Sequence, residues 1–400
     1  MKPKLIAIRP DPEKFLTSRQ QLELLRAAYR RSDTQHLREG LCSLLMLEEA
    51  FDEVVEVLTS CGSLDYRGEM MLTLAHLSAE SRDADCLAHA AAQRGLVQAK
   101  TDVQRSAALA ARGKCETRLG KPDRALETFA SAIALDPHNF DACKRVAAIR
   151  LAADQPESVL TLTRELNAKG ANHARLFAAQ TLAQARLGDI TAARVTDGFV
   201  AFHRAEQLAT PQGWKSIEAF NAALATELLN HPGIRYERYG SASELTWRIE
   251  NPARPDTPLF KALLAQIIAA IENQVALIKE AGDHAWAAAV PRSAVIRNWC
   301  VITESKGFET WHVHQFGWLS GVYYVQIPAS VAQGTTREGC LAFGLPDDLA
   351  GEGGAAAFGE HIIRPREGLM ITFPSQCYHR TYPHGTGEKR ICVAFDLRHD

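Results

Sequence analysis

Apolar residues recur at helical spacing through the first half of the chain, up to about residue 208. In 40–58 (GLCSLLMLEEAFDEVVEVL) and 70–95 (MMLTLAHLSAESRDADCLAHAAAQRG), apolar positions three and four residues apart would form one face of each helix. Short polar or glycine-containing breaks separate these segments. The pattern predicts that residues 1–208 form an all-α domain of successive helices.

One segment of this half, 106–140 (SAALAARGKCETRLGKPDRALETFASAIALDPHNF), resembles a tetratricopeptide repeat, and 185–195 is a fainter copy of part of it. Small residues in the motif let two antiparallel helices approach closely, and the proline ends the second helix. The resemblance implies a repeat array with a concave surface that binds a peptide or protein, or that serves as a scaffold or a homodimer interface. The residues at motif positions are Gly113, Leu119, Gly120, Ala125, Phe129, Ala132 and Pro137.

Beyond residue 208 the pattern changes to two helices followed by short strands. Helical spacing continues at 217–230 and 259–282, and short β-branched and aromatic runs begin at Ser293. Turn residues separate these runs at short intervals, which predicts a jelly roll over 209–400 and an α+β fold for the chain. The last helical hairpin, 174–208, lacks a polar capping helix, so we expect it to pack on 216–230, on 259–282 or on a second chain. The expected strands are 293–304, 318–328, 339–345, 368–373 and 390–397.

Composition and charge narrow the functional classes. The chain has 46% hydrophobic and 23% charged residues and a formal net charge of −2, so nothing indicates nucleic-acid or membrane-surface binding. No uninterrupted apolar stretch reaches the length of a membrane span, and the first residues lack the apolar core of a signal peptide. The nine cysteines form no CxxC pair, which favours reduced thiols in the cytoplasm.

Two histidines at the start of the run WHVHQFGWLSGVYYVQIP (311–328) are the first candidate for chemistry. On a strand, residues i and i+2 point to the same face, so His312 and His314 could bind one metal. Alternatively, both could lie on the solvated face of an edge strand. Glu309 is at an odd separation from the pair, which places it on the opposite face.

A second segment, 364–397, carries His379 and, eleven residues later, Arg390. Together the two segments resemble the Fe(II)/2-oxoglutarate-dependent dioxygenases, in particular a bacterial and phage branch of 2OG-Fe(II) oxygenases. The resemblance implies the double-stranded β-helix form of the jelly roll for residues 209–400. The matching elements, in order, are His312, His314, SGVYYV (320–325), FPS (373–375), His379, Pro383 and Arg390.

The resemblance also implies the roles of these residues. His312, His314 and His379 would bind Fe(II), and Arg390 would hold the far carboxylate of 2-oxoglutarate, with Tyr324 near the same carboxylate. Ascorbate is an optional reductant in such enzymes. Because His314 replaces the usual carboxylate ligand, two arrangements remain open: three histidine ligands, or two with water completing the iron sphere.

Three functions follow from these residues. The first is hydroxylation of a peptide, a protein or a small molecule with decarboxylation of 2-oxoglutarate. The second is a 2-oxoglutarate-independent, cupin-like dioxygenase in which Arg390 is structural, and the third is a non-catalytic interaction protein that acts through its repeats. In the last strand Asp396 is predicted to be structural, and His384 is predicted to be a solvated turn residue.

Overall fold

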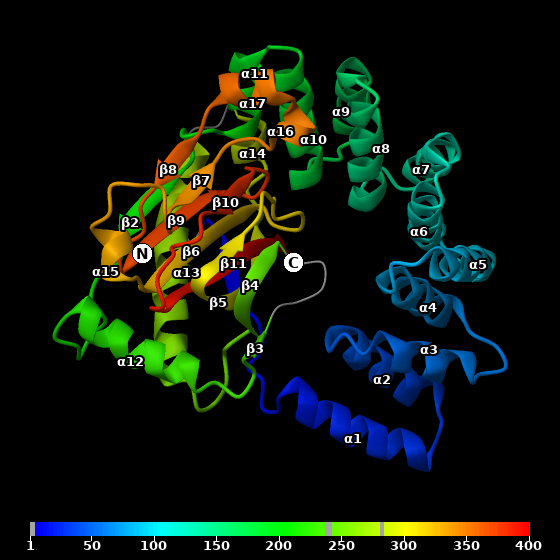
Figure 1. The fold of residues 1–400 in the computed structure, drawn as a ribbon, viewed down its shortest axis with the longest axis horizontal. Helices are drawn as coiled ribbons and strands as arrows, with labels where there is room; N and C mark the ends of the chain where they lie inside the picture. Colours follow the sequence, from blue (N-terminus) through cyan, green and yellow to red (C-terminus); the bar gives the residue numbers. More distant parts are fainter. Residues whose placement is uncertain (1–4, 237–241, 281–283) are drawn as a thin grey trace. The chain divides into compact units, whose positions relative to one another are not determined.

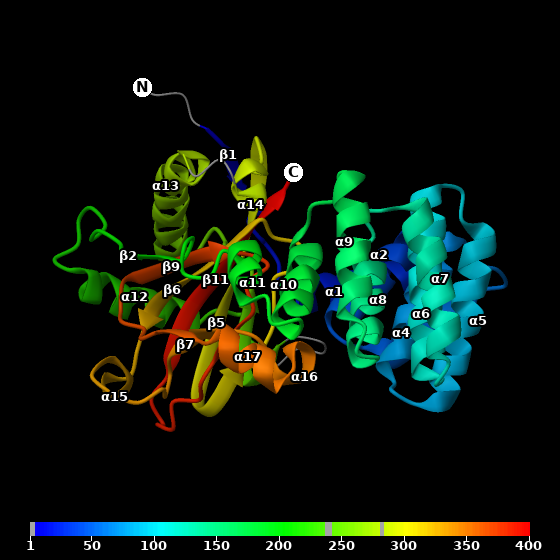
Figure 2. The same cartoon turned by 90° about the horizontal axis from the view of Figure 1, so that it is seen from above.

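The computed structural model describes residues 5–236, 242–280 and 284–400, which form two compact units (Figures 1 and 2). Residues 16–171 are the helical unit, and residues 1–15 together with 172–400 are the sheet unit. The division therefore falls near residue 171, whereas the sequence pattern placed the domain boundary at 208. The α+β fold class is confirmed.

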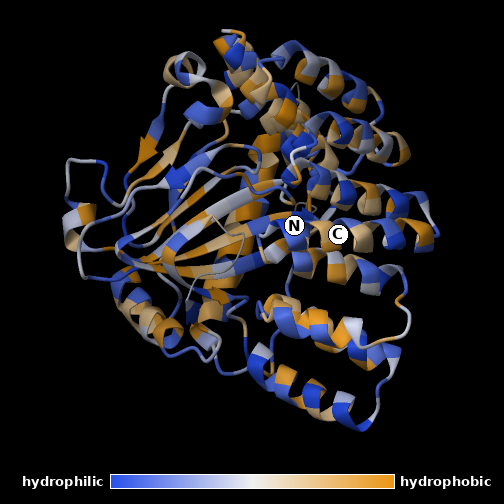
Figure 3. Ribbon diagram, turned by 45° about the vertical axis from the view of Figure 1, so that its right-hand side comes forward, coloured by the Kyte–Doolittle hydropathy of each residue, from blue (hydrophilic) through white to orange (hydrophobic). Residues whose placement is uncertain are grey.

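The helical unit consists of helices that stack as successive neighbours along the chain, as the apolar pattern predicted. In Figure 3 the helices carry both hydrophobic and hydrophilic segments. The helices are α1 (Ser18–Arg31), α2 (Gln35–Leu47), α3 (Phe51–Thr59), α4 (Tyr66–Ser78), α5 (Arg82–Gln98), α6 (Asp102–Arg118), α7 (Pro122–Leu135), α8 (Phe140–Ala152) and α9 (Pro156–Ala168).

Helices α6 and α7 form the pair predicted from the repeat motif. Helix α6 begins with a capping box, in which Thr101 and Gln104 satisfy each other's backbone N–H groups, and α7 begins at Pro122. Gly113 of α6 lies directly against the buried ring of Phe129 on α7. The missing side chain at Gly113 is therefore what allows the two helices to approach. The assignment of this pair as a tetratricopeptide repeat stays a prediction.

Replacing Gly113 by valine should destabilise the helical unit. A Cβ atom there would lie 2.6 Å from Cε1 of Phe129, so the helices must move apart. Overpacking of this kind costs about 1–3 kcal/mol, and valine brings little compensating helix propensity. Urea unfolding followed by far-ultraviolet circular dichroism measures the loss. Gly62→Val is the matched control, because a Cβ at Gly62 meets no atom within 4 Å; equal losses in both variants would contradict the explanation.

The sheet unit contains a large sheet and a small sheet. The large sheet has the order β2-β9-β6-β11-β5-β4-β3, all antiparallel, and β1 pairs with β5 in parallel; the small sheet has the antiparallel order β10-β7-β8. The strands are β1 (Ala7–Pro10), β2 (Arg204–Gln207), β3 (Arg235–Tyr236), β4 (Ser243–Glu250), β5 (Ser293–Glu309), β6 (Leu319–Gln326), β7 (Leu341–Phe343), β8 (His361–Ile363), β9 (Leu369–Pro374), β10 (His379–Thr381) and β11 (Arg390–His399).

Each face of the large sheet has its own core. One face packs on the small sheet through residues such as Tyr324, Phe343 and Phe373, and the other packs on α12 (Ile217–Leu229) and α13 (Pro258–Glu280). Helix α13 is long and apolar enough to cross a membrane by length and composition, yet one apolar face of it, from Phe260 to Ile278, lies in this second core. The two facing sheets form the double-stranded β-helix that the sequence predicted.

The helical hairpin before β2 belongs to the sheet unit. Its helices α10 (Ala174–Arg186) and α11 (Ile190–Asp197) pack on α16 (Asp347–Ala350) and α17 (Glu352–Phe358), not on α12 or α13 as expected. Arg194 of α11 fixes this contact by donating to the carbonyl oxygen of Phe358 at 2.6 Å. Strands β1 to β4 and β10 were not predicted. The four-residue runs of β1 and β2, which extend a sheet edge, carry almost no periodic signal.

Candidate metal centre and cosubstrate pocket

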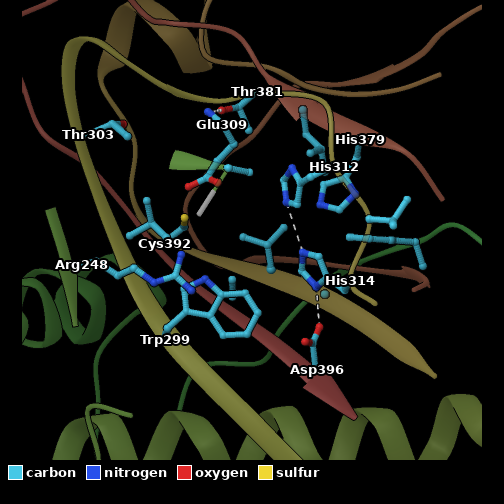
Figure 4. A pocket seen from close by; sticks show the side chains of 18 of the residues that line it. Arg248, Trp299, Thr303, Glu309, His312, His314, His379, Thr381, Cys392 and Asp396 are labelled. Atoms are coloured by element: carbon cyan, nitrogen blue, oxygen red, sulfur yellow. Dashed lines mark hydrogen bonds and ion pairs between the residues drawn. The ribbon is translucent and has the colours of Figure 1, made fainter. Parts of the chain in front are cut away.

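His312, His314 and His379 meet inside a cavity of about 360 Å³ between the two sheets (Figure 4). His312 and His314 lie in the segment between β5 and β6, and His379 opens β10. The main chains of His312 and His379 exchange two hydrogen bonds of 3.0 Å, and the N–H of His314 donates to the carbonyl of Ser375 at 3.0 Å. Backbone pairing therefore holds the HxH segment against the strand that carries the third histidine.

The three imidazoles converge on one point. Nε2 of His314 is 3.3 Å from Nε2 of His312, and one ring nitrogen from each histidine lies within 4.8 Å of the others. Two ligands bonded at ~2.0–2.3 Å to one tetrahedral ion are roughly 3.3–3.8 Å apart, and ligands of an octahedral ion are slightly closer. Small side-chain movements would thus place all three nitrogens on one ion. The HxH pair faces this cavity and not solvent.

The Nδ1 atom of each histidine is occupied, which leaves Nε2 for a metal. Nδ1 of His312 is 2.7 Å from the carbonyl oxygen of Thr310, and Nδ1 of His379 is 3.0 Å from that of Cys377. Nδ1 of His314 hydrogen-bonds the carboxylate of Asp396. Such partners fix the tautomer and the ring orientation of metal-binding histidines.

Burial keeps the imidazoles in the form that binds metals. It lowers the pKa of His312 to about 3, with a further contribution from neighbouring His314. Burial also lowers the pKa of His379 well below its ordinary value, again assisted by the other two histidines. Neutral imidazoles at physiological pH have a free lone pair on one ring nitrogen, which is what a cation requires.

Asp396, which the sequence predicted to be structural, contacts His314 in the cavity. It is 3% exposed, and its carboxylate binds His314 and accepts a 2.8 Å hydrogen bond from Ser320 Oγ. Burial alone would raise the pKa of Asp396, but His314 and Arg398 hold it below its ordinary value. Its even spacing from Arg390 on β11 was the sequence signal that both residues face the same cavity, because alternate residues of a strand share a face.

Asp396→Asn should weaken metal binding without unfolding the domain. The amide can still accept from Nδ1 of His314, but it no longer supplies the negative charge that makes this imidazole a better ligand. Losing such a partner typically costs 10–100-fold in metal affinity. Anaerobic Fe(II) titration of the apoprotein measures the change, and Asp400→Asn, on the exposed pair with Arg9, is the control. Equal affinities in the two variants would contradict a role for Asp396.

Arg390 and Tyr324 lie in the same cavity on the paired strands β11 and β6. Both are buried, at 4% and 0% exposure, and the Arg390 guanidinium carbon lies 5.6 Å from the centre of the Tyr324 ring. Among the residues that the structure describes, Nε and Nη1 of Arg390 and the hydroxyl of Tyr324 have no hydrogen-bond partner. Burial raises the pKa of Tyr324, so the phenol stays protonated and can donate. Buried donors without partners are costly, and a carboxylate would satisfy all three.

Two other polar residues near the site differ in their placement. Glu309 lines the cavity, where it accepts a 2.6 Å hydrogen bond from Ser243, but it lies outside the cluster of converging ligand atoms. His384 is 4% exposed, with Nε2 3.3 Å from the carbonyl oxygen of Thr303, so the prediction of a solvated turn residue was wrong. Flanking glycines indicated a turn but could not show that β5 covers it.

The residues present fit both groups that the sequence resemblance implied. Three imidazoles suit a divalent first-row metal, and the unpaired donors of Arg390 and Tyr324 suit a carboxylate. A double-stranded β-helix with such a cavity has the architecture of a non-haem metal oxygenase. Residues 297–396 match the family described as "Putative 2OG-Fe(II) oxygenase", and the sheet unit is thus a C-terminal oxygenase domain of that family, preceded by stacked helices.

Solved structures of low identity also resemble this chain. A Pseudomonas putida prolyl-4-hydroxylase is 15% identical over 54% of this chain and 99% of its own, with a TM-score of 0.35. A Trichoplax adhaerens prolyl hydroxylase in complex with a peptide fragment is 11% identical over 54% and 90%, also at 0.35. HygX from Streptomyces hygroscopicus, with nickel and 2-oxoglutarate bound, is 10% identical over 53% and 86%, at 0.33. No curated protein matches the chain.

Proposed function

We propose that this protein is an Fe(II)/2-oxoglutarate-dependent hydroxylase whose iron ligands are His312, His314 and His379. The observation that carries the proposal is the combination, in one cavity, of three converging imidazoles with the unpaired buried donors of Arg390 and Tyr324. A three-histidine metal site alone would leave those donors unexplained. A five-carbon diacid that reaches from the metal to Arg390 would satisfy them.

The chain's residues have three tasks in this reaction. The three histidines would hold the metal, while Arg390 and Tyr324 would orient the far carboxylate of the 2-oxo acid. Buried apolar side chains of the cavity wall, such as Val301 and Phe373, would limit the access of water. Bound iron and 2-oxoglutarate supply the oxidation, in which O₂ gives one oxygen atom to a substrate C–H bond and one to succinate as CO₂ leaves.

Anaerobic titration with Fe(II) and 2-oxoglutarate tests the proposal. Bidentate binding of the 2-oxo acid to iron gives a weak visible charge-transfer band, which should appear only when both are present. Oxygen uptake with and without 2-oxoglutarate then separates this enzyme from a cupin-like dioxygenase, which consumes oxygen without it. Absence of the band in a protein that binds Fe(II) would contradict the proposal, and ascorbate dependence can be measured in the same assay.

The substrate is proposed to be a peptide or protein that the helical unit binds, in a reduced cytoplasm. Stacked helices provide an extended surface of the kind that binds peptide segments. The described cysteines are all free thiols, which is consistent with a reducing compartment. A homodimer formed through the helical unit is the alternative use of that surface.

Replacing residues 16–171 by a flexible glycine-serine linker should uncouple 2-oxoglutarate binding from oxidation of the substrate. This variant retains β1, α10 and α11, which belong to the sheet unit. A truncation at residue 208 would remove all three. The Fe(II)/2-oxoglutarate band should persist, while incorporation of isotopically heavy oxygen from O₂ into the proteins of a host-cell extract should be lost. The full chain with His379→Ala is the negative control. Unchanged incorporation by the linker variant would exclude the helical unit from substrate recognition.

A further inference from the structure

Asp197, His203 and Cys377 form a second group of potential metal ligands in the sheet unit, which the iron site does not use. Asp197 ends α11, His203 precedes β2, and Cys377 lies in the turn between β9 and β10. All three are buried, at 2%, 8% and 0% exposure, and one ligand atom from each lies within 4.8 Å of the others. Three segments that are distant in sequence therefore bring a carboxylate, an imidazole and a thiol together.

The polar groups of this cluster are incompletely compensated. Within the described parts of the chain, no lysine or arginine forms an ion pair with Asp197, although its carboxylate is in the protein interior. Nε2 of His203 is buried and has no hydrogen-bond partner in the described part of the chain. A buried carboxylate without a counter-cation costs several kcal/mol, and an unsatisfied buried nitrogen adds about 1–3 kcal/mol. A cation bound between them would remove both costs.

The surroundings of His203 orient it as a ligand. Its Nδ1 lies 2.9 Å from Nδ1 of His361, and the two rings stack in nearly parallel planes, 4° apart. This contact occupies Nδ1 and leaves Nε2 for the cluster, which is how outer partners orient metal-binding histidines. The ring of Phe343 also packs against His203, with the two ring centroids 4.0 Å apart.

We infer that Asp197, His203 and Cys377 bind a structural zinc ion. Thiolate, imidazole and carboxylate are the ligands that zinc takes in proteins, and tetrahedral ligands at ~2.0–2.3 Å are roughly 3.3–3.8 Å apart, so modest side-chain movements close the site. The fourth ligand is the second carboxylate oxygen or the main-chain carbonyl oxygen of Asp197, which is 3.2 Å from Cys377 Sγ. Binding releases the thiol proton to solvent.

The position of this ion gives it a structural task. It joins the end of α11 to the turn that leads directly into β10, and Cys377 accepts the hydrogen bond of iron-site His379 through its main-chain oxygen. Phe343 lies between the two centres, since its ring is 4.0 Å from His203 and 6.0 Å from His379. Zinc would therefore hold the His379 turn in place while remaining separate from the iron.

Cobalt binding to the full-length apoprotein under reducing, oxygen-free conditions tests the inference. Two equivalents of Co(II) should bind tightly, and one should give the near-ultraviolet thiolate-to-cobalt charge-transfer band. His312→Ala, which removes a ligand of the other site, should bind one equivalent and keep the band. Cys377→Ser and His203→Gln should each bind one equivalent and lose the band.

Controls separate this site from the iron cavity and from misfolding. Cys392→Ser should leave the band unchanged, because Cys392 is the thiol that lines the iron cavity. Circular dichroism verifies that each variant is folded. Folded wild-type protein that binds a single equivalent without a thiolate band overturns the zinc site, and the Fe(II)/2-oxoglutarate titration then still decides the proposed function by itself. A band that disappears in Cys392→Ser and persists in Cys377→Ser overturns it as well.

Discussion

His379→Ala should abolish iron binding and all 2-oxoglutarate turnover. The side chain is one of three converging imidazoles, whereas the backbone of His379 is held independently by two hydrogen bonds to His312. The alanine variant can therefore keep the strand pairing and lose only the ligand. The loss of iron affinity should exceed the ~100-fold that removal of an outer-shell partner can cost. Anaerobic Fe(II) titration and succinate production measure the two effects.

A second buried histidine provides the matched control for this variant. His384 lies in the same domain at 4% exposure and is outside the ligand cluster, so His384→Asn tests sensitivity to loss of a buried imidazole. It should retain iron binding within a few fold of the unchanged chain. If His379→Ala binds Fe(II) as tightly as His384→Asn does, His379 is not a ligand.

Much of the site could be predicted from sequence because strand geometry is periodic. The separation of two between His312 and His314 predicted one face of a strand. Both residues lie instead in the segment between β5 and β6, where His312 forms a bridge with His379, and both still line one cavity. The same rule applies along β11, where every second residue from Arg390 to Arg398 lines that cavity. A separation of 11 residues does not by itself place His379 and Arg390 on one face of a strand. Only the resemblance to a family connected the two residues.

The remaining features depend on contacts that no local pattern encodes. The hairpin 174–197 has the same helical periodicity as the helices before it, so sequence assigned it to them and placed the boundary at 208. Its packing on α16 and α17 is a property of the fold. Asp396 is a different case. Its even spacing from Arg390 on β11 placed it on the cavity face, but only the three-dimensional contact with His314 identifies its partner there.

The hydrogen bond between His314 and Asp396 bears on which residues bind the metal. His314 stands where the family usually has a carboxylate ligand. A carboxylate is still present, because Asp396 forms a hydrogen bond with the imidazole of His314. The negative charge is therefore retained near the metal without occupying a ligand position. This arrangement supports the version of the site with three histidine ligands, and it predicts that the Asp396 and His314 variants will affect the same step.

Arg390→Ala should raise the Michaelis constant for 2-oxoglutarate by about 100-fold. Hydrogen bonds to charged groups contribute about 1.5–3 kcal/mol each, and a bidentate pair makes two, so a loss near 3 kcal/mol is a conservative expectation. The charge-transfer titration gives the affinity of the 2-oxo acid directly, and iron affinity should stay unchanged. The 2-oxoglutarate affinity of Arg390→Lys should lie between that of the unchanged chain and that of Arg390→Ala, because an ammonium keeps the charge but not the fork of donors. Tyr324→Phe should cost about 1 kcal/mol, or roughly fivefold.

Arg248, a second arginine that lines the cavity, separates a carboxylate clamp from a general effect of charge. Arg248 lines the same space, but its Nε donates to Glu250 at 2.6 Å and its guanidinium lies 4.9 Å from the centre of the Trp299 ring. Its donors are thus partly satisfied without a ligand, and Arg248→Ala should change 2-oxoglutarate affinity by only a few fold. If the Arg248 and Arg390 variants lose affinity equally, the cavity attracts the diacid by its overall positive charge, and the specific role of Arg390 is wrong. If neither variant loses affinity while oxygen uptake continues without 2-oxoglutarate, the cupin-like alternative replaces the proposed function.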